Sequence, residues 1–244
     1  MFEIDLDLVK KYDKPGPRYT SYPTAPQFHE GFTSENYLDE IIKTNSQKVL
    51  RDLSLYFHIP YCDTLCYFCG CNMLVTRNRD RIKEYVKYLK NEIDLVRPLI
   101  ANTREVAQLH WGGGTPTHLE PDEIKDLVGY IKESFKFKEI VEASCEIDPR
   151  GLTKEHLKAL RDGGFNRISM GVQDFNEEVQ KAVNRIQPES LTREVVNWVR
   201  ELGFHSINLD LMYGLPYQTI ESFEKTIDTV INISPDRIAV FNYA

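Results

Sequence analysis

The chain has 244 residues, enough for one large α/β domain or two small ones, and its 41% hydrophobic and 27% charged residues are typical of a globular protein. Its formal net charge of −7 excludes the basic field that attracts nucleic acid. No apolar stretch approaches the roughly 20 residues that span a bilayer, and the acidic start MFEIDLDLVKKYD lacks the apolar core of a signal peptide. We therefore expect a cytoplasmic protein with no membrane span and no nucleic-acid partner.

The first fifty residues have a mixed composition that differs from the rest of the chain. The stretch PGPRYTSYPTAPQF contains four prolines among aromatic residues, which predicts extended backbone rather than a helix. We expect residues 1–50 to form an amino-terminal arm that packs on a second domain, residues 51–244.

From Leu53 onward, strand-like and helix-like segments alternate. The expected helices are 81–96, 121–135, 154–161, one or more helical stretches up to 202, and 219–231, and the expected strands are 53–59, 105–111, 140–147, 166–172, 206–214 and 237–244. Repeated βα units with short loops predict a parallel sheet. Six in a row favour an incomplete (β/α)6 barrel of the TIM type over a doubly wound sheet. Because no helix follows to cover the sixth strand, we expect a barrel truncated at that strand.

Four of the five cysteines fall within ten residues, directly after the first expected strand. In a reducing cytoplasm such a group indicates a metal or redox site rather than disulfides. The spacing C-x-x-x-C-x-x-C of Cys62, Cys66 and Cys69 places three thiolates at the carboxyl-terminal rim of a barrel, where barrel enzymes assemble their sites. Thiolates are the ligands of iron–sulfur clusters, and three of them leave one iron of a four-iron cluster open. A structural zinc knuckle that also uses Cys71 is the alternative.

Polar or glycine-rich residues follow the later strands. The sequence GGGTPT after the second strand allows close approach of the backbone to a ligand, and it is not a dinucleotide fingerprint. Glu146 ends the third strand, Gln173 follows the fourth, and Asp210 lies within the fifth. Each alone is compatible with a structural role, since buried polar residues often only satisfy the backbone. Their recurrence at successive strand ends predicts one functional rim.

The stretch YFHIPYCDTLCYFCGCN resembles the cluster loop of radical S-adenosylmethionine (SAM) enzymes, and its C-x-C ending resembles the oxygen-independent coproporphyrinogen III oxidases. The resemblance extends from about Lys11 to Ala244. It implies that Cys62, Cys66 and Cys69 bind a [4Fe–4S] cluster whose fourth iron is chelated by SAM. It also implies that Cys71 is a catalytic residue near the cluster and not a ligand. Related haem chaperones carry phenylalanine at that position, so Cys71 argues against a chaperone.

The same resemblance implies two SAM molecules, bound by a set of residues at the rim: Tyr56, Phe68, Gly113, Gly114, Thr115, Glu146, Gln173, Arg185, Asp210 and Ala244. The implied reaction is the oxidative decarboxylation of coproporphyrinogen III to protoporphyrinogen IX by a 5′-deoxyadenosyl radical, in haem biosynthesis. The implied enzyme is a monomer that receives electrons from a low-potential donor. We expect the chain to be a fragment that lacks the carboxyl-terminal region of that family, and therefore to hold a cluster without efficient turnover. A haem chaperone that binds and delivers haem, and a zinc-stabilised interaction module, are the alternatives.

Overall fold

The structure, a computed structural model, describes residues 4–14, 24 and 27–243, which fall into two compact units, 1–47 and 48–244. In the first unit, helix α1 (Leu6–Tyr12) begins at Asp5, whose side chain accepts hydrogen bonds from two backbone amides. Helix α2 (Ser34–Asn45) begins with a capping box formed by Thr33 and Asn36. The prolines of the expected extended arm lie outside the described residues. Packing of this arm on the second unit stays a prediction.

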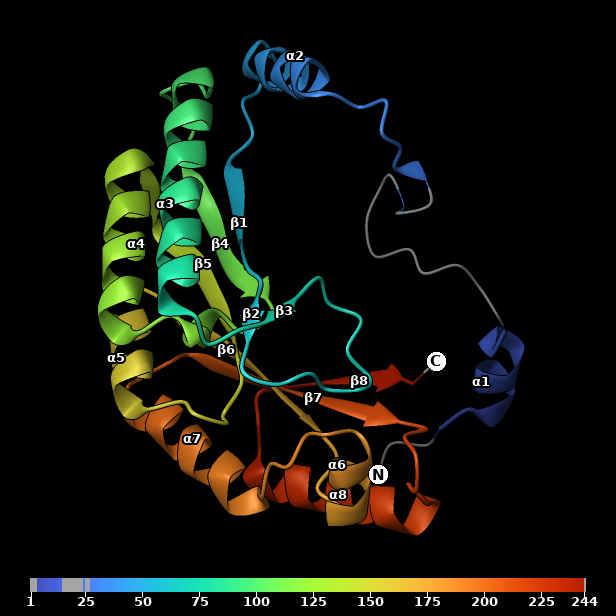
Figure 1. The fold of residues 1–244 in the computed structure, drawn as a ribbon. Coiled ribbons are helices and arrows are strands. Elements are labelled where there is room, and N and C mark those ends of the chain that lie inside the picture. The colour runs from blue at the N-terminus through green and yellow to red at the C-terminus, as the bar shows by residue number, and fades with distance from the viewer. Residues whose placement is uncertain (1–3, 15–23, 25–26, 244) are drawn as a thin grey trace. The chain divides into compact units, whose positions relative to one another are not determined.

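The second unit contains a six-stranded parallel sheet whose strand order is the order along the chain (Figure 1). Its strands are β1 (Leu53–Ile59), β4 (Val106–Gly113), β5 (Phe137–Ile147), β6 (Arg167–Gln173), β7 (Ser206–Tyr213) and β8 (Arg237–Asn242). In a doubly wound sheet the strand order along the sheet reverses at one point, whereas in this sheet the order never reverses. The expected incomplete barrel is confirmed, as an open sheet with β1 and β8 at its two edges.

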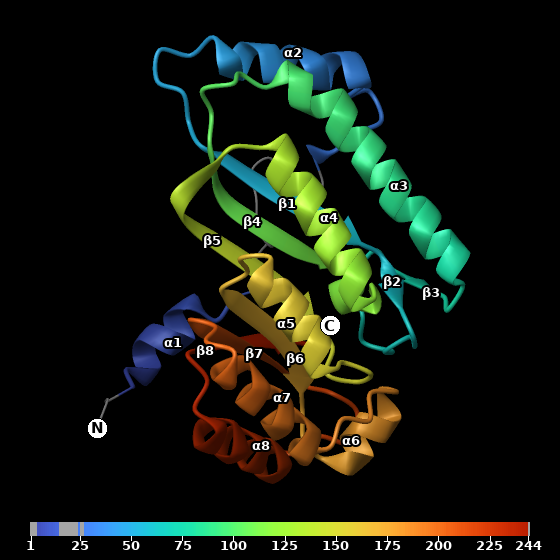
Figure 2. The same ribbon diagram turned by 90° about the vertical axis from the view of Figure 1, so that its left-hand side faces the viewer.

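The helices of this unit lie along the outer face of the sheet (Figure 2). They are α3 (Arg79–Val96), α4 (Pro121–Ser134), α5 (Lys154–Asp162), α6 (Glu177–Ala182), α7 (Glu189–Glu201) and α8 (Ile220–Ile233), with short 3₁₀ turns at Arg97–Leu99 and Pro116–His118. Outward-pointing strand residues are buried beneath them. Trp111 of β4, for example, is fully buried and meets Phe165 edge to face at 5.2 Å between ring centroids. Burial of this face, at roughly 25 cal/mol per Å² of apolar surface, holds the sheet and helices together.

The inner face of the same strands is polar, because successive side chains of a strand point to opposite sides. The parallel register places Glu146 beside Ser169, Ser169 beside Asn208, and Gly171 beside Asp210. The polar residues expected at separate strand ends therefore lie on one continuous wall. Among the described helices, none is both long and apolar enough to cross a bilayer.

Two very short strands frame the cysteine loop and were not anticipated from the sequence. Strand β2 (Tyr61–Cys62) pairs in parallel with β3 (Leu74–Val75), so that Cys62 faces Val75. Each has only two residues, too few for a hydrophobic period to reveal. The pairing closes the loop that carries the four cysteines.

Candidate functional site

The two ends of the cysteine loop are fixed to the end of β1. The amide of Leu74 donates to the carbonyl of Pro60 at 2.7 Å, and the amide of Thr76 donates to that of Cys62 at 3.1 Å. The Nε2 atom of His58, on β1, lies 2.7 Å from the carbonyl oxygen of Asn72. These contacts close a loop of more than ten residues, and His58 helps to fix it to β1.

The middle of the loop is held by the turn that follows α6. The side chain of Asn184 donates to the carbonyl of Leu65 at 2.7 Å, and the amide of Tyr67 donates to the carbonyl of Val183 at 3.0 Å. Asn184 has φ 54°, a left-handed conformation that asparagine tolerates better than most residues. Phe68 packs against the small apolar cluster that includes Val183. The loop is therefore anchored at both ends and in its middle.

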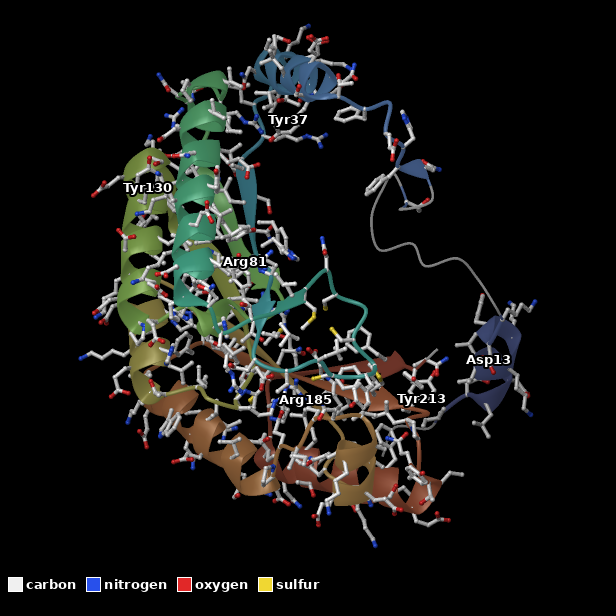
Figure 3. The ribbon with its side chains drawn as sticks, in the orientation of Figure 1. Asp13, Tyr37, Arg81, Tyr130, Arg185 and Tyr213 are labelled. Carbon is white, nitrogen blue, oxygen red and sulfur yellow. The ribbon has the colours of Figure 1, made fainter. Side chains whose placement is uncertain are left out.

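A cavity of about 150 Å³ lies between this loop and the strand ends. In Figure 3, Arg185 lies close to the sulfur atoms of the loop. Tyr56 is not among the lining residues, and Ala244 lies outside the described residues. The other predicted site residues all line the cavity, namely Cys62, Cys66, Phe68, Cys69, Cys71, Gly113, Gly114, Thr115, Glu146, Gln173, Arg185 and Asp210.

The glycine turn at the end of β4 packs closely against the residues that follow β1. Gly113 has φ 121°, a conformation that side chains rarely adopt, and its amide donates to Oε2 of Glu146 at 3.3 Å. A Cβ on Gly114 would lie 2.8 Å from the Pro60 carbonyl, so this close approach requires glycine. The hydroxyl of Thr115 then lies 3.3 Å from Sγ of Cys62. The turn thus brings one expected metal ligand, Cys62, against one expected cofactor residue, Thr115.

Tyr56 reaches the site through a histidine that the sequence did not single out. Its ring stacks on that of His110, with centroids 5.7 Å apart, and its hydroxyl lies 3.0 Å from Nδ1 of His58. His110 Nδ1 lies 2.6 Å from the Ser144 hydroxyl, and its Nε2 lies 3.3 Å from Oε1 of Glu146. His110 thereby positions the Glu146 carboxylate. The alternation of Gln108, His110 and Gly112 along β4 is the sequence signal for this polar face.

Asp148 and Arg150 form a second group that the sequence did not single out. Asp148 accepts hydrogen bonds from Arg150 at 2.6 Å and from Arg185 at 3.1 Å. Burial alone would raise the pKa of Asp148, but the Arg185 charge and the Arg150 hydrogen bonds outweigh it and leave this pKa lowered. Asp148 lies two residues beyond Glu146, where the third strand ends. This position at a strand end is the sequence feature from which Asp148 could have been identified as a site residue.

Two cavity-lining residues carry buried polar atoms without a hydrogen-bond partner, Oε1 of Gln173 and Nε of Arg185. Gln173 also has φ 68°, which is unusual and strained for a residue other than glycine. Natural structures leave few buried polar atoms unsatisfied, and such exceptions concentrate at sites that bind a ligand. The cavity therefore fits a polar ligand with both donors and acceptors.

The thiols of the loop sit in different electrostatic surroundings. Burial raises the pKa of Cys62, although the Thr115 hydroxyl opposes it. A hydrogen bond from Cys71 lowers the pKa of Cys69 to about 6, and the same contact, aided by partial desolvation at the cavity edge, raises the pKa of Cys71. Cys66 is buried, with the Arg150 guanidinium 3.2 Å from its sulfur.

No three His, Cys, Asp or Glu side chains in the described part of the chain are placed to hold a single metal ion. A four-iron cluster makes a different demand, since each thiolate binds a different iron and the sulfurs need not converge on one point. The donor set of Cys62, Cys66 and Cys69 fits such a cluster, because all three are thiols and all line one cavity beside the orphaned Gln173 and Arg185 atoms.

The sequence profile of the radical SAM superfamily matches residues 56–230. This chain belongs to that superfamily. Membership implies a [4Fe–4S] cluster and SAM as cofactors, in agreement with the donor set.

Two curated relatives of this radical SAM chain are named oxygen-independent coproporphyrinogen III oxidase. The one from Helicobacter pylori (strain J99) is 49% identical over 245 residues, covering 100% of this chain and 54% of that protein. The one from Escherichia coli K12 is 50% identical over 240 residues, covering 98% of this chain and 51% of that protein. The solved structure of coproporphyrinogen III oxidase (HemN) from Escherichia coli, described as a radical SAM enzyme, superimposes with a TM-score of 0.89 over 99% of this chain and 53% of that one, at 49% identity. The chain thus spans about half the length of the relatives it matches.

Proposed function

We propose that this chain is the cluster- and SAM-binding part of an oxygen-independent coproporphyrinogen III oxidase, which converts coproporphyrinogen III to protoporphyrinogen IX in haem biosynthesis. The observation that carries the proposal is the single cavity lined by the three spaced cysteines, the glycine turn and the polar strand-end residues. The names of relatives 49–50% identical over nearly the whole chain support the choice of substrate.

In this proposal Cys62, Cys66 and Cys69 hold the cluster and leave one iron for SAM. A cluster held there would supply, when reduced, the electron for cleavage of SAM. Gly113, Gly114 and Thr115 offer backbone and hydroxyl groups to the methionine part of SAM. The orphaned Nε of Arg185 and Oε1 of Gln173 offer a donor and an acceptor for polar groups of the cofactor.

The carboxylates of the cavity have separate tasks. Glu146 is held by the Gly113 amide and by His110, which aims it at the space below the cysteine loop. Burial raises the pKa of Asp210, and the nearby charge of Glu146 adds to this effect. In the proposal, Glu146 accepts from the cationic amino group of SAM, and Asp210 accepts from hydroxyl groups of the cofactor. Phe68 adds an apolar ring to the lining of the cavity.

Each propionate that becomes a vinyl group would lose one β-hydrogen atom to the 5′-deoxyadenosyl group derived from SAM, one molecule of carbon dioxide, and one electron to an external electron acceptor. Two such events consume two SAM molecules, which the proposal includes. Cys71 lies exposed at the end of the loop and is proposed to act on the substrate side rather than as a ligand. The low-potential electron donor, the monomeric state and the cytoplasmic location stay predictions.

The experiment is an anaerobic turnover assay of the full-length protein with coproporphyrinogen III, SAM and a chemical reductant. Formation of protoporphyrinogen IX, with one carbon dioxide released for each vinyl group, is the expected result. Stoichiometric haem binding without vinyl formation would instead support the haem chaperone. One tightly bound zinc without iron or sulfide would support the interaction module.

A further inference from the structure

Cys66 differs from the other expected cluster ligands in its contacts with cations. Its side chain is buried, 7% exposed, and Nη2 of Arg150 lies 3.2 Å from its sulfur. Nη1 of Arg185 lies 3.6 Å from the same sulfur. The contact of Cys62, by contrast, is the neutral hydroxyl of Thr115. A charged donor forms a stronger hydrogen bond than a neutral one.

One carboxylate organises both guanidinium groups. Asp148 accepts from Arg150 through both oxygens, at 2.6 Å from Nη2 and 3.0 Å from Nε, and from Nη1 of Arg185 at 3.1 Å. The side chains of Asp148 and Arg185 are 15% and 9% exposed, so water screens this group weakly. Arg185 is also tied to the carbonyl of Gly171 at 2.8 Å. Arg150, which is closer to the sulfur, takes its orientation from Asp148.

We infer that Arg150 and Asp148 set the reduction potential of the cluster through the Cys66 sulfur. This inference rests on the proposed cluster ligation by Cys62, Cys66 and Cys69. Reduction adds one negative charge to the unit of cluster and thiolates, and hydrogen bonds to the sulfurs are a principal control of its potential. The Arg150 guanidinium stabilises the added charge and raises the potential. The Asp148 carboxylate opposes the added charge and lowers it.

The two residues therefore make opposite predictions. In Arg150→Met the cluster potential moves to a more negative value, because a charged donor to the sulfur is lost. In Asp148→Asn the potential moves to a more positive value, because the two arginines lose their counter-charge. A residue that only shapes the loop would not produce shifts of opposite sign.

The experiment is a potentiometric titration of the reconstituted full-length protein without substrate or SAM, followed by electron paramagnetic resonance of the reduced cluster. The matched control is Arg77→Met. Arg77 pairs with Asp63 in the same loop, its side chain is 78% exposed, and no sulfur contact is found for it. Its loss should leave the potential unchanged, since water and salt screen an exposed charge. Resonance Raman spectra should also show a higher iron–thiolate stretching frequency in Arg150→Met.

Unchanged potentials in both variants, or shifts of the same sign, would overturn the inference. Should Arg150→Met fail to assemble a cluster, Arg150→Gln carries the test, because glutamine removes the charge but keeps an amide that can hydrogen-bond to Asp148. A Gln variant with the wild-type potential would then refute the role. A wild-type protein that holds no cluster would refute the proposed function as well, whereas a normal cluster with unshifted variants would refute this inference alone.

Discussion

Oε2 of Glu146 accepts a hydrogen bond from the backbone amide of Gly113 at 3.3 Å, so a carboxylate of β5 fixes the glycine turn at the end of β4. The same carboxylate meets His110 at 3.3 Å through its other oxygen. Two elements of the proposed SAM site are thus joined before any cofactor binds. Such prior positioning of binding groups reduces the entropy that binding must overcome.

The change Glu146→Gln should weaken SAM binding without removing the cluster. The variant keeps the shape of the side chain but loses the charge that the proposal assigns to the cofactor amino group. We expect the dissociation constant to rise about tenfold, equivalent to about 1.4 kcal/mol, in anaerobic calorimetry of cluster-loaded protein. Glu142→Gln is the control, because Glu142 lies on the same strand but pairs with Arg167. Equal affinity in Glu146→Gln and wild type would contradict the assignment.

Cys71→Ser should keep the cluster spectrum and reduce turnover in the full-length protein. The reason is that Cys71 is exposed at the edge of the cavity and lies outside the proposed ligand set. We expect product formation to fall by an order of magnitude or more, while iron and sulfide contents stay at the wild-type level. Cys69→Ser provides the contrast, since it should lose the cluster. Loss of the cluster in Cys71→Ser would make Cys71 a ligand and revive the four-thiolate zinc site.

In the cluster-free protein, Cys69 should be the first thiol of the loop to react with iodoacetamide. A hydrogen bond from Cys71 lowers the pKa of Cys69 to about 6, so the reactive thiolate is present above that pH and lost below it. The labelling rate measured by mass spectrometry should therefore be half-maximal near pH 6. In Cys71→Ala the midpoint should move to higher pH, because the donor is gone. A midpoint that stays in place would show that Cys71 does not stabilise the thiolate.

Gln173→Gly should stabilise the fold, although Gln173 belongs to the proposed site. The residue has φ 68° and a buried amide oxygen without a partner, and both features cost free energy. We expect Gln173→Gly to exceed Gln173→Ala in free energy of unfolding by about 1 kcal/mol in urea titrations, since alanine keeps the strained conformation and glycine relieves it. Equal stabilities of the two variants would mean that the conformation carries no strain.

The sequence predicted the parallel strands and their helices because these segments have clear apolar periods and glycine or proline at their ends. Glu146, Gln173 and Asp210 could be grouped because the ends of parallel strands meet at one edge. Arg150 could not be assigned in this way, since its contact with Cys66 joins residues 84 positions apart. Asn184 was missed for the same reason, because its bond to the Leu65 carbonyl joins residues 119 positions apart. Local patterns locate a rim, but they do not reveal which residues bond across it.

The most direct test of the account is the formation of 5′-deoxyadenosine from SAM by reconstituted full-length protein, given coproporphyrinogen III and a strong reductant without oxygen. The account predicts iron and sulfide in the protein and release of 5′-deoxyadenosine, both lost in Cys66→Ala. A protein that holds one tight zinc after anaerobic reconstitution, with no iron, no sulfide and no 5′-deoxyadenosine, would contradict it.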